Sequence, residues 1–345
     1  MRKFASYLFN TPNSDINFKN IIFDGLTVTG SFNCGGLIGH DAILNSNQMK
    51  IEGCNSTKNG ISVTGGHFDE YSKDSDKFRN GIGSLVGMTF HCRPYIDGGV
   101  IDGETGKVTA SEIKVDRVTS FYQDDKGGVN CGGLIGYSGT GAEIKNIKLV
   151  GSNQNSVIGA PNALNAAGFI GFAQTRAKDM SSDNWLSQSI YLENCTLYNL
   201  SVQAKRSAAG LYGRSWNSEW SVKYIYINNC AVIGENGNYE IRAYGSGNDD
   251  VHDCVGGFIS GCAGAHNSQV SSIQNSYIEG YAIEGHNVGG IIGRTTYKPA
   301  YLKNLYVKDC DIVINKNSGG REGGIVGYSN QNLSGYNLAT YNGNL

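Results

Sequence analysis

Apolar and polar residues alternate in short runs along this chain, and the runs return at intervals. Residues 190–193 and 225–228 both place an apolar side chain at every second position. A period of two predicts β-strands with one buried and one exposed face. The eight copies of this pattern begin at positions 21, 49, 113, 147, 190, 225, 271 and 305. Each copy therefore predicts a half-buried strand.

A turn residue follows the strand pattern at a fixed place. It is Gly, Asn or Asp in seven of the eight copies. These residues tolerate a left-handed backbone or close a local side-chain turn, which a corner between two strands requires. Arg117 is the exception, and it does not favour such a corner.

A second pattern, close to Gly-Gly-Leu-Ile-Gly-Tyr, also returns eight times. Its copies begin at positions 35, 83, 132, 167, 209, 256, 289 and 323, so they lie 33 to 49 residues apart. A period in this range indicates stacked units. Glycine weakens a strand, so either a close backbone approach or a large side chain packed over it must compensate. The glycine that defines the predicted column is Gly36, Gly133, Gly168, Gly210, Gly257, Gly290 and Gly324.

Each unit contains three short strand patterns, Gly or Asn corners and no helix pattern. This arrangement predicts an all-β fold, a right-handed parallel β-helix of about eight rungs with loop insertions. Rungs stack at about 4.8 Å, which gives a rod roughly 40 Å long. We expect one domain over residues 1–345, with repeats at approximately 18–40, 49–88, 113–137, 147–172, 190–214, 225–261, 271–294 and 305–328.

Two further features bear on the architecture. The longest insertions lie near residues 65–81, 89–110, 173–187 and 235–253. Binding surfaces are often built in such loops. The alternative fold is an eight-bladed β-propeller, whose repeats also run about 40–45 residues. A blade needs four strands, whereas each unit here shows three and has no Trp-Asp signature.

Composition excludes two classes of partner. The chain has 28 basic and 30 acidic residues, whereas a nucleic-acid binder needs a basic stripe. No apolar run reaches about 18 residues, so no membrane span is expected. Residues 1–5 begin with a basic stretch, but the chain turns polar by Asn10, too soon for a signal peptide. Both ends run into the repeat pattern without a cap, which favours a segment of a larger chain or assembly.

The glycine motif and the Asn-Cys corners, such as Asn194-Cys195 and Asn229-Cys230, resemble the GLUG motif. This repeat occurs in bacterial surface and secreted proteins, including adhesins and some extracellular proteases. The resemblance spans about residues 18–330. It implies a stalk or passenger region at the cell surface or outside the cell, without shared catalytic residues. We therefore expect a non-catalytic spacer that binds a protein or glycan on another surface.

Four cysteines share one position after the corner: Cys54, Cys195, Cys230 and Cys310. In a β-helix they would form a buried ladder of small residues, because a free Cys behaves as a small apolar side chain. Neighbouring rungs bring Cα atoms within disulfide range, so a bond between Cys195 and Cys230 is an alternative. A metal or redox role is a third. No Cys-x-x-Cys pair is present, and we predict no metal and no cofactor.

Tyr191, Tyr226 and Tyr306 share a second position, which alternates with the core residues and faces outward. Stacked aromatic rings on a flat β face can bind sugars, or they are simply residues that favour strands. These three tyrosines are the predicted surface binding residues.

Two other functions stay open. Parallel β-helix lyases and glycosidases use carboxylates beside an Arg or Lys on one outer face. Asp249, Asp250 and Asp253 surround His252, with Arg242 near in sequence, and they are the strongest enzyme candidate. The third hypothesis is an intracellular structural protein of a larger assembly.

Overall fold

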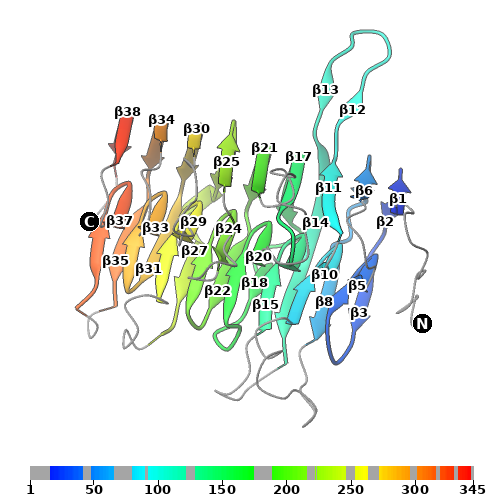
Figure 1. Cartoon of the computed structure of the whole chain (residues 1–345), viewed down its shortest axis with the longest axis horizontal. Coiled ribbons are helices and arrows are strands. Elements are labelled where there is room, and N and C mark those ends of the chain that lie inside the picture. The colour runs from blue at the N-terminus through cyan, green and yellow to red at the C-terminus, as the bar shows by residue number, and fades with distance from the viewer. Residues whose placement is uncertain are drawn as a thin grey trace.

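The protein is a β-solenoid whose coils lie side by side along one axis (Figure 1). The computed structural model describes residues 16–41, 48–65, 80–89, 92–121, 129–174, 189–215, 222, 224–245, 253–262, 272–295, 301–315, 319–329 and 333–342. Within these stretches, consecutive coils pair in parallel, and only β12 (Val100–Ile101) and β13 (Val108–Thr109) pair antiparallel. The predicted parallel β-helix is confirmed. The propeller is wrong, because its blades need strands that pair within one repeat.

The outer sheet has 18 strands, and two corners divide each of its coils into three segments. Several strands run through the first corner. Strands that begin in the first segment are β1 (Ile16–Lys19), β6 (Gln48–Glu52), β11 (Arg93–Asp97), β17 (Ala142–Gly151), β21 (Ser189–Tyr198), β25 (Tyr224–Asn228), β30 (Ser272–Glu279), β34 (Tyr301–Lys308) and β38 (Ser334–Tyr341). In the second segment lie β26 (Ala231–Ile233) and the small separate pair β2 (Ile22–Phe23) and β7 (Asn55–Ser56).

The third segments complete the outer sheet, and β14 also supplies the second segment of its coil. They are β3 (Thr27–Thr29), β8 (Ile61–Gly65), β14 (Ser111–Ser120), β18 (Val157–Gly159), β22 (Ser201–Ala204), β27 (Tyr239–Ala243), β31 (Tyr281–Gly285) and β35 (Asp311–Ile314). A short 3₁₀ turn, η2 (Glu235–Gly237), precedes β27.

After the third segment, the chain passes through two more parallel sheets joined by the Gly-Gly motif. The inner sheet precedes this motif's turn and contains β4 (Cys34–Gly35), β9 (Asn80–Gly83), β15 (Val129–Gly132), β19 (Asn165–Ala167), β23 (Ser207–Ala209), β28 (Cys254–Gly256), β32 (Asn287–Gly289) and β36 (Arg321–Gly323). The return sheet follows it and contains β5 (Ile38–Asp41), β10 (Val86–Thr89), β16 (Ile135–Ser138), β20 (Ile170–Ala173), β24 (Tyr212–Ser215), β29 (Ile259–Cys262), β33 (Ile292–Thr295) and β37 (Val326–Ser329). We call the two residues between these sheets the glycine turn.

The corners use the residue types that the sequence indicated. At the first corner, Asn146, Asn194 and Asn229 all have φ of 53°. At the second corner, Asn199 has φ of 51° and Gly280 has φ of 74°. Such backbone angles suit Asn and Gly and strain other residues.

In the coil that contains Arg117, the second corner is built differently from those of the other coils. The strand β14 continues through this position, and its pairing with β8 shifts between Val115 and Arg117. The shift is a β-bulge, which bends a strand without a left-handed residue. The corner that Arg117 left open in the sequence is therefore made by a bulge.

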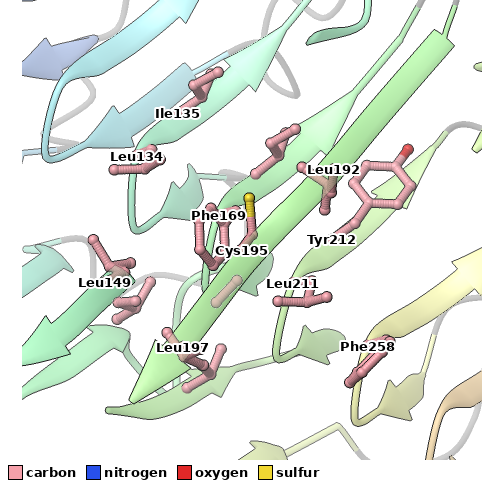
Figure 2. Close-up of a cluster of buried hydrophobic side chains, with 14 of the residues drawn as sticks. Leu134, Ile135, Leu149, Phe169, Leu192, Cys195, Leu197, Leu211, Tyr212 and Phe258 are labelled. Atoms are coloured by element: carbon pink, nitrogen blue, oxygen red, sulfur yellow. The ribbon is translucent and has the colours of Figure 1, made fainter. Parts of the chain in front are cut away.

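One continuous core fills the solenoid. Side chains from the outer sheet, such as Leu149, Leu192 and Leu197, lie in the same buried cluster as Phe169 and Leu211 of the glycine turns (Figure 2). Each of these five side chains is fully buried. The strands of the outer sheet bury alternate residues, as the period of two predicts, whereas strands such as β9 of the inner sheet and β10 of the return sheet bury every residue.

The glycine column shows both contacts that could compensate for glycine in a strand: a close backbone approach and a side chain packed over it. A Cβ at Gly168 would lie 1.9 Å from the Gly210 carbonyl oxygen and 2.9 Å from Leu197 Cδ1. The backbone of the next coil and a core side chain thus occupy the same space. A Cβ added at position 133, 210, 257 or 290 would likewise lie 1.9 to 2.1 Å from the next coil's carbonyl oxygen.

The inner and return sheets also touch backbone to backbone. A Cβ at Gly81 would lie 1.9 Å from the Gly87 oxygen, and a Cβ at Gly136 would lie 2.1 Å from the Ile82 nitrogen. Glycine on the facing sides of both sheets permits this spacing. The inner sheet packs on the third segment with its other face, where a Cβ at Gly65 would lie 2.6 Å from the Cys34 sulfur.

The four predicted insertions differ in how much of each one the structure describes. The stretch 89–110 contains a hairpin, β12 and β13, that projects beyond the other strands (Figure 1). Most of 65–81, most of 173–187 and the end of 235–253 lie outside the described residues. Near the C-terminus, β38 begins a ninth coil, which the predicted repeats, ending at residue 328, did not include.

Candidate functional site

The cysteine ladder forms in part. Cys195 and Cys230 follow the first corner in neighbouring coils, since Glu193 pairs with Asn228 and Thr196 pairs with Ala231. Cys54 lies in the same column, three coils before Cys195.

Cys310 is not in this column, and its predicted place is wrong. Leu305 pairs with Ser276 and occupies the position, whereas Cys310 follows the second corner at Asp309. The motif of alternating apolar residues and a turn occurs twice in each coil, once before each corner. The single alignment of the sequence mixed the two, and it put Cys310 beside residues of the other corner.

The ladder cysteines are buried thiols, as the packing interpretation expects. The Cys195 sulfur lies 3.3 Å from the Glu193 carbonyl oxygen, and the Cys230 sulfur lies 3.3 Å from that of Asn228. Burial raises the pKa of Cys195 well above its ordinary value, and the neighbouring Cys230 raises it further. A neutral buried thiol is unreactive, because the thiolate is the nucleophile and metal ligand. Among the described residues, no group of three or more His, Cys, Asp and Glu could hold a metal.

The tyrosine column is also divided between two places. Tyr191 and Tyr226 are paired on the outside of the first segment. Tyr306 lies on the outside of the second segment and pairs with Tyr277, so its predicted place in the first column is wrong. The cause is again the motif that occurs twice in each coil.

These rings pack on neighbouring side chains, although Tyr306 remains 37 % exposed. Tyr277 and Tyr306 stack with centroids 4.7 Å apart and planes 9° apart. Tyr224 stacks on Tyr226 at 6.1 Å and 12°. The Lys145 ammonium lies 5.0 Å from the centre of the Tyr191 ring. A sugar stacks on an open ring face, so this arrangement favours strand stabilisation as the role of the tyrosines.

Charges on the outer face likewise neutralise one another, both between coils and within one strand. Arg93 contacts Glu143 at 2.9 Å, and Glu143 also contacts Lys145 at 2.9 Å. Tyr95 beside them donates to Asp97 at 3.0 Å. Burial raises the pKa of Tyr95 to about 12, and its hydrogen bond to Asp97 adds to the effect. This face of the outer sheet offers balanced ion pairs.

An asparagine ladder at the first corner was missed by sequence reasoning. The Asn194 side-chain nitrogen donates to the Asn146 oxygen at 2.7 Å, and Asn304 donates to Asn275 at the same distance. Asn337 extends the ladder to Asn304 at 2.9 Å. The signal was the Asn that ends the first strand pattern in each later unit, and the mixed alignment of the two corners concealed it.

The outward residues of the return sheet form one column that changes character along the rod. Their order is His40, Met88, Tyr137, Phe172, Arg214, Gly261, Arg294 and Tyr328. Met88, Tyr137 and Phe172 make a separate buried cluster, in which the two rings stack at 5.6 Å. From Arg214 onward two arginines, Arg214 and Arg294, alternate with Gly261 and Tyr328, and we call these four residues the basic part of the column.

Charged groups concentrate around this basic part. Arg214 is 6 % exposed and Asp253 is 5 % exposed. Burial raises the pKa of the neighbouring Cys254 thiol to about 11, while the positive charges of Arg214 and Arg294 act in the opposite direction. The Tyr328 ring has the Arg294 guanidinium carbon 4.9 Å from its centre and that of Arg321 at 4.4 Å.

The proposed enzyme cluster is only partly described. Asp249, Asp250 and His252 lie outside the described residues. Asp253 lies beside the basic part of the return sheet. Arg242 instead contacts Glu284 at 3.0 Å on the third segment of the outer sheet and stacks on Tyr244.

The hairpin carries exposed apolar side chains. Ile101 is 70 % exposed, Val100 48 % and Val108 46 %. Asp102 accepts from the backbone nitrogens of Glu104 at 2.8 Å and Thr105 at 3.1 Å, and these bonds lower its pKa. The tip is therefore an ordered turn.

Comparisons add no relative: no family model, no curated protein and no solved structure matches this chain. Within the described part of the chain, no helix is long and apolar enough to cross a membrane.

Proposed function

We propose that this chain is a non-catalytic repeat region of an adhesin-like surface or secreted protein. It acts as a rigid spacer and presents a binding surface to a protein or glycan on another surface. The resemblance to GLUG repeats suggests the setting, outside the cell or on its surface.

The observation that carries this proposal is the use of the outer side chains between coils. The asparagine ladder, the stacked tyrosines and the ion pairs each join neighbouring coils at 2.7 to 6.3 Å. A rod held by such ladders resists bending, since each coil contacts its neighbours along its whole length. Rigidity of this kind supports a spacer.

We assign contact with the partner to the hairpin, and not to Tyr191, Tyr226 and Tyr306. The tyrosine rings already pack on neighbouring side chains, whereas the hairpin holds three more exposed β-branched side chains away from the rod. Exposed apolar side chains grouped on a projection are typical of interaction sites.

The test is attachment of the whole chain to arrayed extracellular proteins and glycans. In one variant, residues 99–110 are deleted, so that Gly98 is followed directly by Ser111, as Asn146 is followed by Ile147 in the next coil. In the other, Tyr191→Ser is combined with Tyr226→Ser. We expect the hairpin variant to lose attachment and the tyrosine variant to keep it. Attachment that is unchanged without the hairpin would overturn this assignment.

A carbohydrate-active enzyme is the second candidate, because Asp253 lies with Arg214 and Arg294 at one place on the rod. Turnover of acidic or neutral polysaccharides, abolished by Asp253→Asn, would establish it and reject the spacer. An intracellular assembly protein is the third. The full gene sequence, together with mass spectrometry of the thiols in cells, separates it from the first.

A further inference from the structure

The outward face of the first segment changes character over the last three coils. Ser272, Tyr301 and Ser334 are consecutive members of one outward column, which continues from Tyr226. Neighbouring strands lie about 4.8 Å apart, so Tyr301 has a serine on each side at this spacing. A serine side chain is too small to cover a tyrosine ring. Tyr301 is accordingly 38 % exposed.

A second outward column runs beside the first. It contains Gln274, Lys303 and Tyr336, each two residues further along its strand. Residues two apart in a strand point to the same side of the sheet, so Tyr301 and Tyr336 share one face. One coil and two residues separate them, which places their backbones about 8 Å apart. Tyr336 is 61 % exposed.

Earlier tyrosines of the first column are covered by neighbours, and these two are not. The Lys145 ammonium lies 5.0 Å from the centre of the Tyr191 ring, and Tyr224 stacks on Tyr226. Among the residues that the structure describes, no second ring and no cation lies against Tyr301 or Tyr336. The two rings therefore present open faces to solvent.

The polar side chains around these rings are also available. Within the described stretches, Lys303 takes part in no ion pair and the Gln274 side-chain amide in no hydrogen bond. The acid of the neighbouring second segment, Glu279, pairs with Lys308 instead. Amide, ammonium and hydroxyl groups supply donors and acceptors together. We call this set the Tyr301 patch: Ser272, Gln274, Tyr301, Lys303, Ser334 and Tyr336.

We propose that the Tyr301 patch binds an extended, β-linked chain of neutral hexopyranoses. A pyranose ring has an apolar face of C–H bonds, which stacks on an aromatic ring, and an edge of hydroxyl groups, which hydrogen-bonds to polar side chains. Two rings on a flat sheet suit a flat glycan ribbon better than a helical one. The inference rests on the proposed function, since it names a glycan for the rod.

Two other classes of ligand fit the patch less well. A specific protein interface takes about 20 to 30 residues from each partner, whereas this patch has six. An acidic polymer needs several positive charges, whereas Lys303 is the one charged member of the patch and the chain carries a net charge of -2. A neutral sugar uses the rings and the hydroxyl and amide groups without that requirement.

The patch lies apart from the hairpin. Its strands β30, β34 and β38 lie toward the C-terminal end of the rod, whereas β12 and β13 project from its N-terminal half (Figure 1). Contact with two or three sugars should give a dissociation constant of about 1 mM, at which a washed array retains nothing. Glycan binding in solution and hairpin-dependent attachment to an array are therefore separate measurements.

NMR of the whole chain with short oligosaccharides tests the proposal. The probes are cellotetraose, maltotetraose, a galacturonate tetramer and glucose. Saturation of the protein's aromatic protons should transfer to the ring C–H protons of cellotetraose, and titration should give its dissociation constant. We expect the helical maltotetraose to bind more weakly, the acidic tetramer to bind no more tightly, and glucose to show no transfer.

Four variants show which residues bind. Tyr301→Ser and Tyr336→Ser should each weaken cellotetraose about fivefold, as expected for the loss of one stacked ring. The matched control is Tyr191→Ser, in the same outward column, whose ring already lies under Lys145; it should leave affinity within about twofold. Lys303→Gln should also stay within about threefold, because it keeps a donor. Tyr336 is the more exposed ring, so Tyr336→Ser should keep the melting temperature even if Tyr301→Ser lowers it.

Three results would overturn the proposal. In the first, cellotetraose shows no transfer at millimolar concentration. In the second, Tyr336→Ser binds cellotetraose like the parent chain. In the third, the galacturonate tetramer binds more tightly than cellotetraose and Lys303→Gln abolishes its binding, so that charge and not stacking decides. If the sugars fail to bind while hairpin-dependent attachment persists, the glycan assignment is wrong and the spacer function stands.

Discussion

The glycine turns and the first corners lie on different stretches of each coil, and they join neighbouring coils in different ways. At the glycine turn, backbone touches backbone, and a Cβ at Gly168 would lie 1.9 Å from the next carbonyl oxygen. At the first corner, side chains make the contact, as Asn194 does with Asn146 at 2.7 Å. The turn requires that a side chain be absent, whereas the corner requires a particular one. Substitutions should therefore act through steric overlap at the turn and through lost hydrogen bonds at the corner.

The largest effect is expected at the glycine turn. Gly168→Ala places a methyl group against the Gly210 carbonyl and Leu197, and neither the backbone nor the packed core can give way. We expect a loss of more than about 4 kcal/mol in the free energy of unfolding, or no folded protein. Urea denaturation measures it. The control is Gly103→Ala in the hairpin, where a Cβ meets nothing within 4 Å, and stability should change little.

Alkaline pH should destabilise the protein, because both the inner and the outer sheet contain buried thiols. Burial raises the pKa of Cys131 in the inner sheet to about 12 and that of Cys310 in the outer sheet to about 11. In the unfolded state, a cysteine thiol has its ordinary pKa of about 8.5. The unfolded state then binds fewer protons, so stability is complete below about pH 8.5 and falls as pH rises toward the folded values.

Each buried thiol should contribute a slope of about 1.4 kcal/mol per pH unit in that range. Urea denaturation between about pH 8 and 11 measures the total slope. Cys131→Ala and Cys310→Ala should each flatten it by one thiol's share. A slope that neither substitution changes would contradict the protonated state of these thiols.

The first corner should give an intermediate effect. Asn194→Ala loses the hydrogen bond to Asn146 and places Ala at φ of 53°, which together should cost about 2 to 3 kcal/mol. Asn194→Gly loses only the hydrogen bond, because glycine adopts a positive φ without strain, and it should cost about 1 kcal/mol. Chemical denaturation of both variants separates the two terms. Equal losses would show that the side-chain ladder, and not the left-handed backbone, decides the cost.

The smallest effect is expected on the outer tyrosines. Tyr191→Ser removes a half-buried ring and its contact with Lys145, for a loss of about 0.5 to 1 kcal/mol. Thermal unfolding detects this as a shift of a few degrees or less. A loss as large as that of Gly168→Ala would mean that the outer face, and not the glycine turn, dominates stability.

The sequence predicted the fold because its period is carried by backbone requirements. Glycine at the turn and Asn, Asp or Gly at the corners have few substitutes, so their spacing is visible without coordinates. The placement of Cys310 and Tyr306 failed because each coil contains two similar corners, and one alignment merged them. The pairing of strands distinguishes the corners, and that information is long-range.

The candidate site was harder to predict for a physical reason. Arg214, Arg294 and Arg321 come from two sheets and three coils, and no local pattern links them. Their convergence depends on the register between coils. The stacking of Tyr277 on Tyr306 is likewise a property of neighbouring coils, so the sequence showed that the rings lie outward but not that they pack on one another.

The most direct test of the account is a disulfide that reports the register of the coils. Ser276 lies against Cys230, whose backbone nitrogen donates to the Ser276 hydroxyl at 2.9 Å, and Leu305 occupies the matching position in the next coil. In Ser276→Cys, mild oxidation followed by peptide mass spectrometry should find the new thiol bonded to Cys230. A bond between position 276 and Cys310 would contradict the two-corner coil and restore the single column.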